Sequence, residues 1–155
     1  MSTPKTILYV EDDAVVRMAY QSRLQKQGFI VEPAMDGLAA MRSLSARVPD
    51  LVLLDLMLPR MNGEEVLKFI RSQSKLRTVP VIILSTNSII DVKQEYLLEQ
   101  ANKRLIKQNC TFATMLEAIF EVLPSAIPSH YFAPANATAR PTSAFLPVDL
   151  NFAAA

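Results

Sequence analysis

The chain has 155 residues, half of them hydrophobic, with a formal net charge of +1 and one cysteine, Cys110. This length favours one domain with a normal core and an appendage, and the hydrophobic content excludes a fully disordered chain. The near-neutral charge predicts no nucleic-acid binding, no apolar run is long enough to cross a membrane, and the lone cysteine excludes an intrachain disulfide, so we expect a cytoplasmic protein.

Short apolar segments typical of β-strands alternate with segments in which apolar residues recur at helical spacing. In chain order, the strand-like segments are residues 7–10, 29–32, 51–54, 79–84 and 103–106. The helical segments begin after Asp13, at Asp36, at Asn62, at Asp91 (the weakest) and at Thr111. This alternation predicts an α/β fold with a doubly wound, five-stranded parallel sheet that is covered on both faces.

Two of the strand-like segments end in acidic residues. Glu11-Asp12-Asp13 follows the first segment, and Asp55 follows the third. Alone, the first run would be interpreted as a helix cap, but the carboxyl ends of parallel strands meet at one edge of a sheet. Carboxylates that share a small site need an offsetting cation, and Mg²⁺, which takes oxygen ligands, is the expected partner.

Two further segments end in groups that suit an anion. The hydroxyls of Ser85 and Thr86 follow the fourth strand-like segment, and Lys107 follows the fifth. A lysine supplies a point charge to an anion, and hydroxyl groups donate hydrogen bonds to it. Together with the acidic residues, these groups favour a site for a phosphoryl group that is carried on Asp55.

Residues 5–123 resemble the receiver domain of two-component response regulators. The resemblance rests on the order and spacing of Glu11, Asp12, Asp55, Pro59, Gly63, Ser85 and Lys107. It implies a flavodoxin-like (βα)5 receiver fold, for which we expect a domain over residues 1–123.

The resemblance also implies a metal centre and a source of phosphate. Asp12, Asp55 and the backbone carbonyl of Met57 would bind Mg²⁺ directly, and Glu11 would act through a water molecule. Asp55 would accept a phosphoryl group from a sensor histidine kinase or a histidine phosphotransfer protein.

Further roles follow from the same resemblance. Lys107 would neutralise charge on the phosphoryl oxygens, and Ser85 would bind the phosphoryl group and pull its loop inward, which is the switch. The protein would be a signalling protein with self-catalysed phosphoryl transfer and weak autophosphatase activity rather than a turnover enzyme.

Three positions depart from the family pattern. Arg104 stands where an aromatic residue is usual, so we expect an altered readout of the switch. Gln108 replaces the usual proline after Lys107; because a cis bond without proline costs about 2.5–4 kcal/mol, we expect a trans peptide. Thr86 is larger than the usual small residue and would narrow access to the phosphoryl group.

Residues 124–155 hold five of the ten prolines and almost no charge. They predict a Pro/Ala-rich tail with no output domain. We expect Tyr131, Phe132, Phe145 and Phe152 to dock in apolar grooves, at least partly on a second subunit, which would give a homodimer. In the competing interpretation, the tail covers the fourth and fifth helices of its own domain until Asp55 is phosphorylated.

Other functions remain open at this point. The domain would be a phosphorelay intermediate if it had no output of its own, or a degenerate receiver if it bound partners irrespective of phosphate. An aspartate-nucleophile phosphatase is less well supported, because such enzymes typically carry a second aspartate two residues after the nucleophile, where this chain has Met57.

Overall fold

The structure, a computed structural model, describes residues 3–86, 95–96 and 99–127. The helix expected from Asp91 begins outside the described residues, and so do the apolar anchors of the tail. The elements are β1 (Thr6–Val10), α1 (Ala14–Lys26), β2 (Ile30–Ala34), α2 (Gly37–Ala46), β3 (Leu51–Asp55), α3 (Gly63–Ser72), β4 (Val81–Ser85), β5 (Lys103–Ile106), the 3₁₀ turn η1 (Lys107–Asn109), α5 (Phe112–Val122) and the 3₁₀ turn η2 (Pro124–Ala126).

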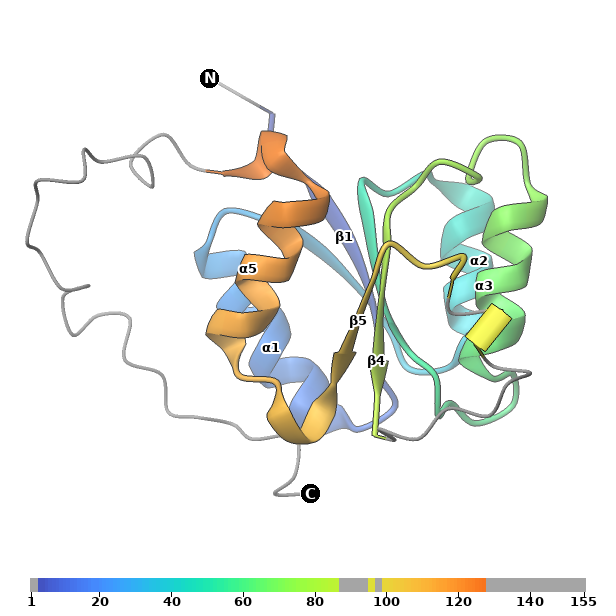
Figure 1. Ribbon diagram of the computed structural model, residues 1–155, viewed down its shortest axis with the longest axis horizontal. Coiled ribbons are helices and arrows are strands. Elements are labelled where there is room, and N and C mark those ends of the chain that lie inside the picture. Colours follow the sequence, from blue (N-terminus) through green and yellow to red (C-terminus); the bar gives the residue numbers. More distant parts are fainter. Residues whose placement is uncertain (1–2, 87–94, 97–98, 128–155) are drawn as a thin grey trace, which may run out of the picture.

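The five strands form one parallel sheet in the order β2-β1-β3-β4-β5. Helices α1 and α5 cover one face of the sheet, and α2 and α3 cover the other (Figure 1). The predicted doubly wound α/β fold is therefore confirmed. In this strand order β1 and β3 are neighbours at the point where the winding of the sheet reverses, and open parallel sheets commonly bind ligands beyond the carboxyl ends of such strands.

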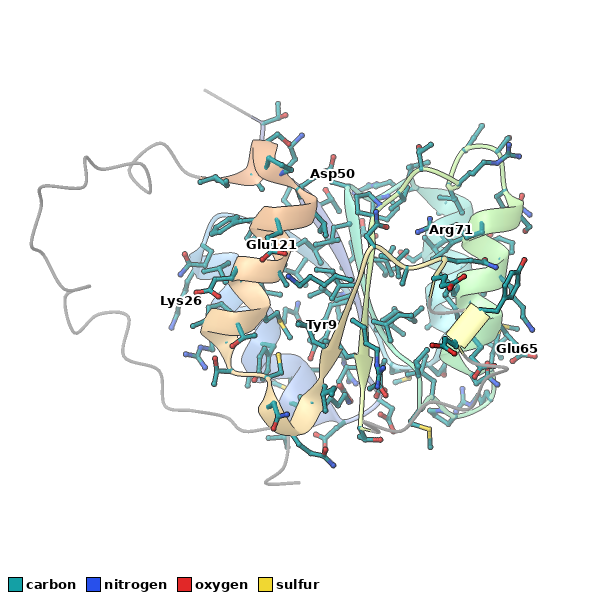
Figure 2. The ribbon with its side chains drawn as sticks, viewed as in Figure 1. Tyr9, Lys26, Asp50, Glu65, Arg71 and Glu121 are labelled. Atoms are coloured by element: carbon teal, nitrogen blue, oxygen red, sulfur yellow. The ribbon has the colours of Figure 1, made fainter. Side chains whose placement is uncertain are left out.

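The central strands of the sheet are buried on both faces. Every residue of β3 and β4 is buried. Tyr9, Tyr20 and Phe112 belong to the apolar cluster under α1 and α5, with successive ring centroids 6.5 and 6.0 Å apart. A second cluster fills the space under α2 and α3 (Figure 2). Side chains at the strand ends are thus held by packing below them.

The helices begin where the sequence places good capping residues. Asp13, Asp36, Asn62 and Thr111 each accept a hydrogen bond from a backbone N–H in the first turn of the helix that follows. Asn62 also forms a capping box with Glu65, which satisfies two backbone donors at once. The helix starts predicted at Asn62 and Thr111 are confirmed, and both residues act as caps.

Two strands differ from the sequence prediction by two residues at one end, whereas β1 and β3 differ by a single residue. The second was expected at residues 29–32 but runs from Ile30 to Ala34, because β2 is an edge strand and tolerates Pro33 there. The fourth was expected to begin at Val79, yet the Val79 N–H bonds to Leu76 in the preceding turn and β4 starts at Val81. The strand also ends one residue later than expected, so Ser85 is its last residue.

The chain continues past α5 for a short distance within the described residues. The turn η2 follows α5, and Ala126 and Ile127 pack against the apolar cluster under α1 and α5. The expected docking of the tail falls on residues that the structure does not describe. None of the described helices has the length and apolarity needed to cross a membrane.

Candidate functional site

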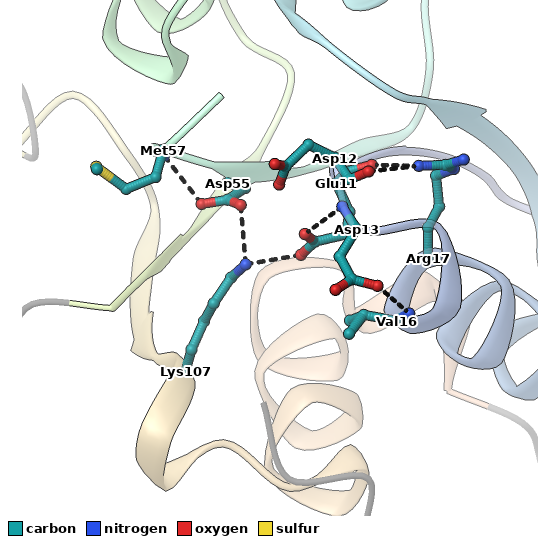
Figure 3. Close-up of polar contacts among 8 residues, drawn as sticks. All are labelled: Glu11, Asp12, Asp13, Val16, Arg17, Asp55, Met57 and Lys107. Atoms are coloured by element: carbon teal, nitrogen blue, oxygen red, sulfur yellow. Dashed lines mark hydrogen bonds and ion pairs between the residues drawn. The ribbon is translucent and has the colours of Figure 1, made fainter. Parts of the chain in front are cut away.

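The carboxyl ends of β1 and β3 bring three acidic residues together. Glu11 and Asp12 follow β1, and Asp55 is the last residue of β3. Ligand oxygens of these three carboxylates lie within 4.8 Å of one another. Asp13, by contrast, caps α1 by accepting a hydrogen bond of 3.0 Å from the Val16 N–H (Figure 3). The structure therefore gathers the acidic residues that sequence reasoning proposed for a metal.

Asp55 is held by backbone contacts. Its Oδ1 accepts a hydrogen bond of 3.0 Å from the Met57 N–H, and only 1% of its surface is exposed. Gly63, at the start of α3, lies against the backbone behind it: a Cβ atom at this glycine would overlap the Asp55 carbonyl oxygen and lie 2.7 Å from the Leu56 Cα. A side chain at position 63 would therefore displace the end of β3.

Lys107 reaches the acidic residues from the carboxyl end of β5, the edge strand of the sheet. Its Nζ donates to Glu11 Oε2 at 2.7 Å and to Asp55 Oδ2 at 2.8 Å (Figure 3). The residue is the first of η1, which is closed by a bond from the Cys110 N–H to the Lys107 carbonyl. The Lys107–Gln108 peptide is trans, as predicted.

Burial dominates the electrostatics of the two acids that face this lysine. It raises the pKa of Glu11 to about 7, although the hydrogen bond from Lys107 opposes the shift. Burial also raises the pKa of Asp55, again against the attraction of Lys107. For Lys107 itself, burial would lower the pKa, but Asp55 and Glu11 outweigh it and the pKa is raised. Burial thus penalises the charged forms of both acids, and the single ammonium group of Lys107 does not fully offset that penalty.

This donor set fits a hard divalent cation. Three carboxylates offer the oxygen ligands that Mg²⁺ takes, and a bound cation would offset the charge that burial penalises. Asp12 and Met57 are exposed, so water can complete a coordination shell on that side.

The other predicted residues differ in their burial. Ser85, at the end of β4, is buried and borders the same edge of the sheet, whereas Thr86 is exposed. Arg104 lies on β5, opposite Ile83 of β4, and is partly buried. The altered readout expected from Arg104 stays a prediction.

The loop that follows Asp55 is fastened to the loop before α2. Arg60 has a φ of 65°, which is unusual for a residue with a side chain. Its Nη1 lies 3.0 Å from Oδ2 of the buried Asp36, the residue that caps α2. A Cβ atom at Gly37 would overlap the Met61 carbonyl oxygen. Sequence reasoning did not identify this contact, although the Asp36-Gly37 pair marked the helix start.

Sequence reasoning also missed Arg17. Its Nη1 donates to the carbonyl oxygens of Glu11 and Asp12, at 2.8 and 3.2 Å. The only sequence signal was its place in the first turns of the helix that follows the acidic run.

Comparisons with known proteins agree with this geometry. The family model of the response regulator receiver domain matches residues 7–120. The transcriptional regulatory protein CseB of Streptomyces coelicolor is 43% identical over 88 residues, which are 57% of this chain and 36% of CseB. The chain thus spans about a third of that relative.

Solved structures give the same result. The receiver domain of a sensor histidine kinase from Pseudomonas aeruginosa, with magnesium coordinated in its active-site cleft, is 28% identical with a TM-score of 0.70, over 79% of this chain and 99% of that one. The response regulator TrrA from Thermotoga maritima, in complex with Mg²⁺ and BeF, is 26% identical with a TM-score of 0.67, over 76% and 98%.

Proposed function

Because the chain belongs to the response regulator receiver domain family, we propose that it is a phosphorylation-controlled signalling switch of a two-component system. Asp55 accepts a phosphoryl group from a sensor histidine kinase or a histidine phosphotransfer protein. The observation that carries this proposal is the position of the Asp55 carboxylate, which is buried at the end of β3 with Lys107 2.8 Å from its Oδ2.

The transfer itself is a substitution at phosphorus. A carboxylate oxygen of Asp55 forms a bond to the phosphorus of the phosphohistidine, the P–N bond breaks, and the imidazole leaves with the electron pair. In such reactions catalysis comes from positioning and from charge stabilisation around the phosphoryl oxygens. The Met57 N–H fixes Oδ1, and the Lys107 ammonium group stands where it can neutralise the incoming oxygens.

A magnesium ion fits the acidic side of this site. Asp12, Asp55 and the Met57 carbonyl would bind it, and Glu11 would do so through a water molecule. When bound, the ion neutralises negative charge on the phosphoryl oxygens. The raised pKa of Glu11 and of Asp55 supports this assignment, because burial penalises their charged forms and a bound cation would relieve that penalty.

Ser85 connects the chemistry to a partner. It is buried at the end of β4, at the same edge as Asp55, and its hydroxyl can bind a phosphoryl group there. Movement of the loop after β4 toward the phosphoryl group then biases a two-state element that a partner protein reads. Thr86, exposed next to it, limits access to the site and so slows hydrolysis of the acyl phosphate.

Two alternatives keep the fold but change the role. A phosphorelay intermediate would pass its phosphoryl group on to another histidine. A degenerate receiver would bind partners irrespective of phosphate, and Arg104, in place of an aromatic residue on β5, is the observation that favours it. We propose a protein rather than a nucleic acid as the partner of this domain, in the cytoplasm. Dimerisation through the tail stays a prediction.

The proposal is tested with acetyl phosphate, followed by mass spectrometry of peptides. We expect label on Asp55 that requires Mg²⁺ and disappears in Asp55→Asn. Asp13→Asn is the matched control: it makes the same chemical change beside the site, and asparagine caps a helix as well as aspartate does. Labelling that persists in Asp55→Asn, or that ignores EDTA, would contradict the proposal.

A further inference from the structure

The side chain of Arg17 turns back from the first turns of α1 toward the acidic loop (Figure 3). Its Nη1 bridges two successive backbone carbonyls, at 2.8 Å from the Glu11 oxygen and 3.2 Å from the Asp12 oxygen. The backbone N–H of the same residue bonds to the Asp13 carbonyl at 2.8 Å, as the first bond of the helix. Arg17 thus contacts the carbonyl of every residue in the acidic run.

A guanidinium group beside three acidic residues would ordinarily pair with a carboxylate. Here two of those carboxylates are engaged otherwise. Glu11 binds Lys107 and also accepts from the Asp13 N–H, while Asp13 caps α1. The Arg17 side chain instead donates to the main chain, where it fixes the two peptide groups that flank Asp12.

Asp12 is the acid that depends most on this support. Its side chain is exposed, and within the described residues its carboxylate has neither a hydrogen bond nor an ion pair to hold it. Glu11 and Asp55 are buried and held by Lys107. Only the main chain can set the direction of the Asp12 carboxylate, and Arg17 is bonded to the carbonyls on both sides of it.

We propose that Arg17 is a positioning residue for the metal centre: it holds the Glu11–Asp12 backbone so that the Asp12 carboxylate is directed at a divalent cation. This inference rests on the proposed function of the site. Groups that support the direct ligands of a metal without touching it typically contribute a factor of ten to a hundred in affinity.

A positioning role of Arg17 and a purely electrostatic role predict opposite changes in Mg²⁺ affinity when the residue is replaced. If Arg17 acted only through its positive charge, it would repel Mg²⁺, and its removal would tighten binding. If it positions Asp12, its removal loosens the loop and weakens binding. The sign of the change therefore separates the two roles.

The experiment measures Mg²⁺ affinity by calorimetry for the full chain, with MgCl₂ as the only titrant and at constant ionic strength. We expect Arg17→Met to bind about tenfold more weakly, and Arg17→Lys, which keeps the charge but not the planar group, to fall between it and the wild type. Arg47→Met is the matched control, because that arginine is exposed and pairs with Glu32 on β2 and not with an acid of the site. It should bind Mg²⁺ as the wild type does.

Two further measurements separate positioning from damage to the fold. In acetyl phosphate labelling, Arg17→Met should need more Mg²⁺ for half-maximal rate but approach the wild-type rate at saturation. If Arg17→Met fails to fold, the metal-free Arg17→Lys variant is used in its place. Relative to the wild type, the amide chemical shifts of Asp12 and Asp13 should change more in this variant than those of the remote helix α3.

The outcomes are distinct. If the wild type binds Mg²⁺ and Arg17→Met binds it equally well or more tightly, the positioning role of Arg17 is wrong and the proposed function is unaffected. The inference is equally overturned if the Asp12 and Asp13 shifts of Arg17→Lys match the wild type. Wild-type protein that does not bind Mg²⁺ contradicts the proposed function, and this inference with it.

Discussion

Lys107 and Glu11 are 96 residues apart in sequence, and their side chains form a buried ion pair of 2.7 Å. The same ammonium group also binds Asp55. A phosphoryl group on Asp55 would compete for this lysine, so phosphorylation would loosen the Lys107–Glu11 contact. The negative charge of Glu11 would then be offset mainly by the bound Mg²⁺. The ion pair links the chemistry at β3 to the end of β5.

The metal-free protein should lose stability as the pH rises. Glu11 has a pKa of about 7 in the folded protein against 4.5 in its ordinary state. The folded protein therefore retains a proton that the unfolded chain has lost. This stabilisation is complete below a pH of about 4.5 and is lost as the pH rises through about 7, and the raised pKa of Asp55 acts in the same direction. Urea unfolding in EDTA between pH 5 and pH 8 measures it.

Glu11→Gln provides the control for that experiment, because glutamine keeps the shape without titrating. The variant and the wild type should be similar near pH 5, and the variant should be the more stable at pH 8. A difference that stays constant with pH, or that grows in favour of the wild type, would show that Lys107 outweighs burial at Glu11.

Mg²⁺ should stabilise the protein more at pH 8 than at pH 6. Protons and the cation compete for the same carboxylates, and Glu11 is largely protonated below its pKa of about 7. We expect the rise in melting temperature on adding MgCl₂ to shrink as the pH falls, and to be absent in Asp12→Asn. An equal rise at both pH values would place the ion elsewhere.

Gly63→Ala should damage the site as well as the fold. The added methyl group would overlap the Asp55 backbone, and overpacking of this kind costs about 1–3 kcal/mol. Gly28→Ala is the matched control: its φ of 94° makes alanine costly by about 1–2 kcal/mol, but no atom lies within 4 Å. Both variants should lose stability, measured by urea unfolding.

Only Gly63→Ala should also slow labelling of Asp55, at a temperature where both variants are folded. If the two variants label at the same rate, the close approach of Gly63 to Asp55 has no role in placing the carboxylate.

Ser85→Ala should separate phosphorylation from switching. The variant keeps Asp55, Lys107 and the acidic residues, so acetyl phosphate should still label it. It lacks the buried hydroxyl at the end of β4, so the change in amide chemical shifts on phosphorylation should be smaller than in the wild type. Thr86→Ala, an exposed change next to it, should leave that response intact. A full response in Ser85→Ala would remove the switch role.

The sequence predicted the fold and the gathering of the acidic residues for one physical reason. In a parallel sheet with helical crossovers, every strand ends at the same edge, so Glu11, Asp12 and Asp55 were expected on one edge once their strands were recognised. They meet because β1 and β3 are neighbours in the sheet. The helix starts could be predicted because residues that cap helices by local hydrogen bonding, such as Asn62, mark them in the sequence.

What the sequence could not predict depends on where long side chains go. Nothing in local spacing indicates that Lys107 would bind Glu11 as well as Asp55, or that Arg17 would donate to carbonyls instead of carboxylates. The φ of Arg60 has no local signal either, since it accompanies an ion pair with Asp36 from another loop. The ends of β2 shifted because an edge strand accepts Pro33.

The proposed function depends above all on the transfer of a phosphoryl group from a P–N bond to Asp55. The most direct measurement uses phosphoimidazole, a small-molecule mimic of phosphohistidine, with Mg²⁺, and then borohydride, which reduces an aspartyl phosphate to homoserine that peptide mass spectrometry can locate. We predict homoserine at position 55 and at no other acidic residue, dependent on Mg²⁺ and strongly reduced in Lys107→Ala. Homoserine at Asp12 or Asp13, or no homoserine at all while Mg²⁺ is bound, would contradict the role of Asp55 as the phosphoryl acceptor.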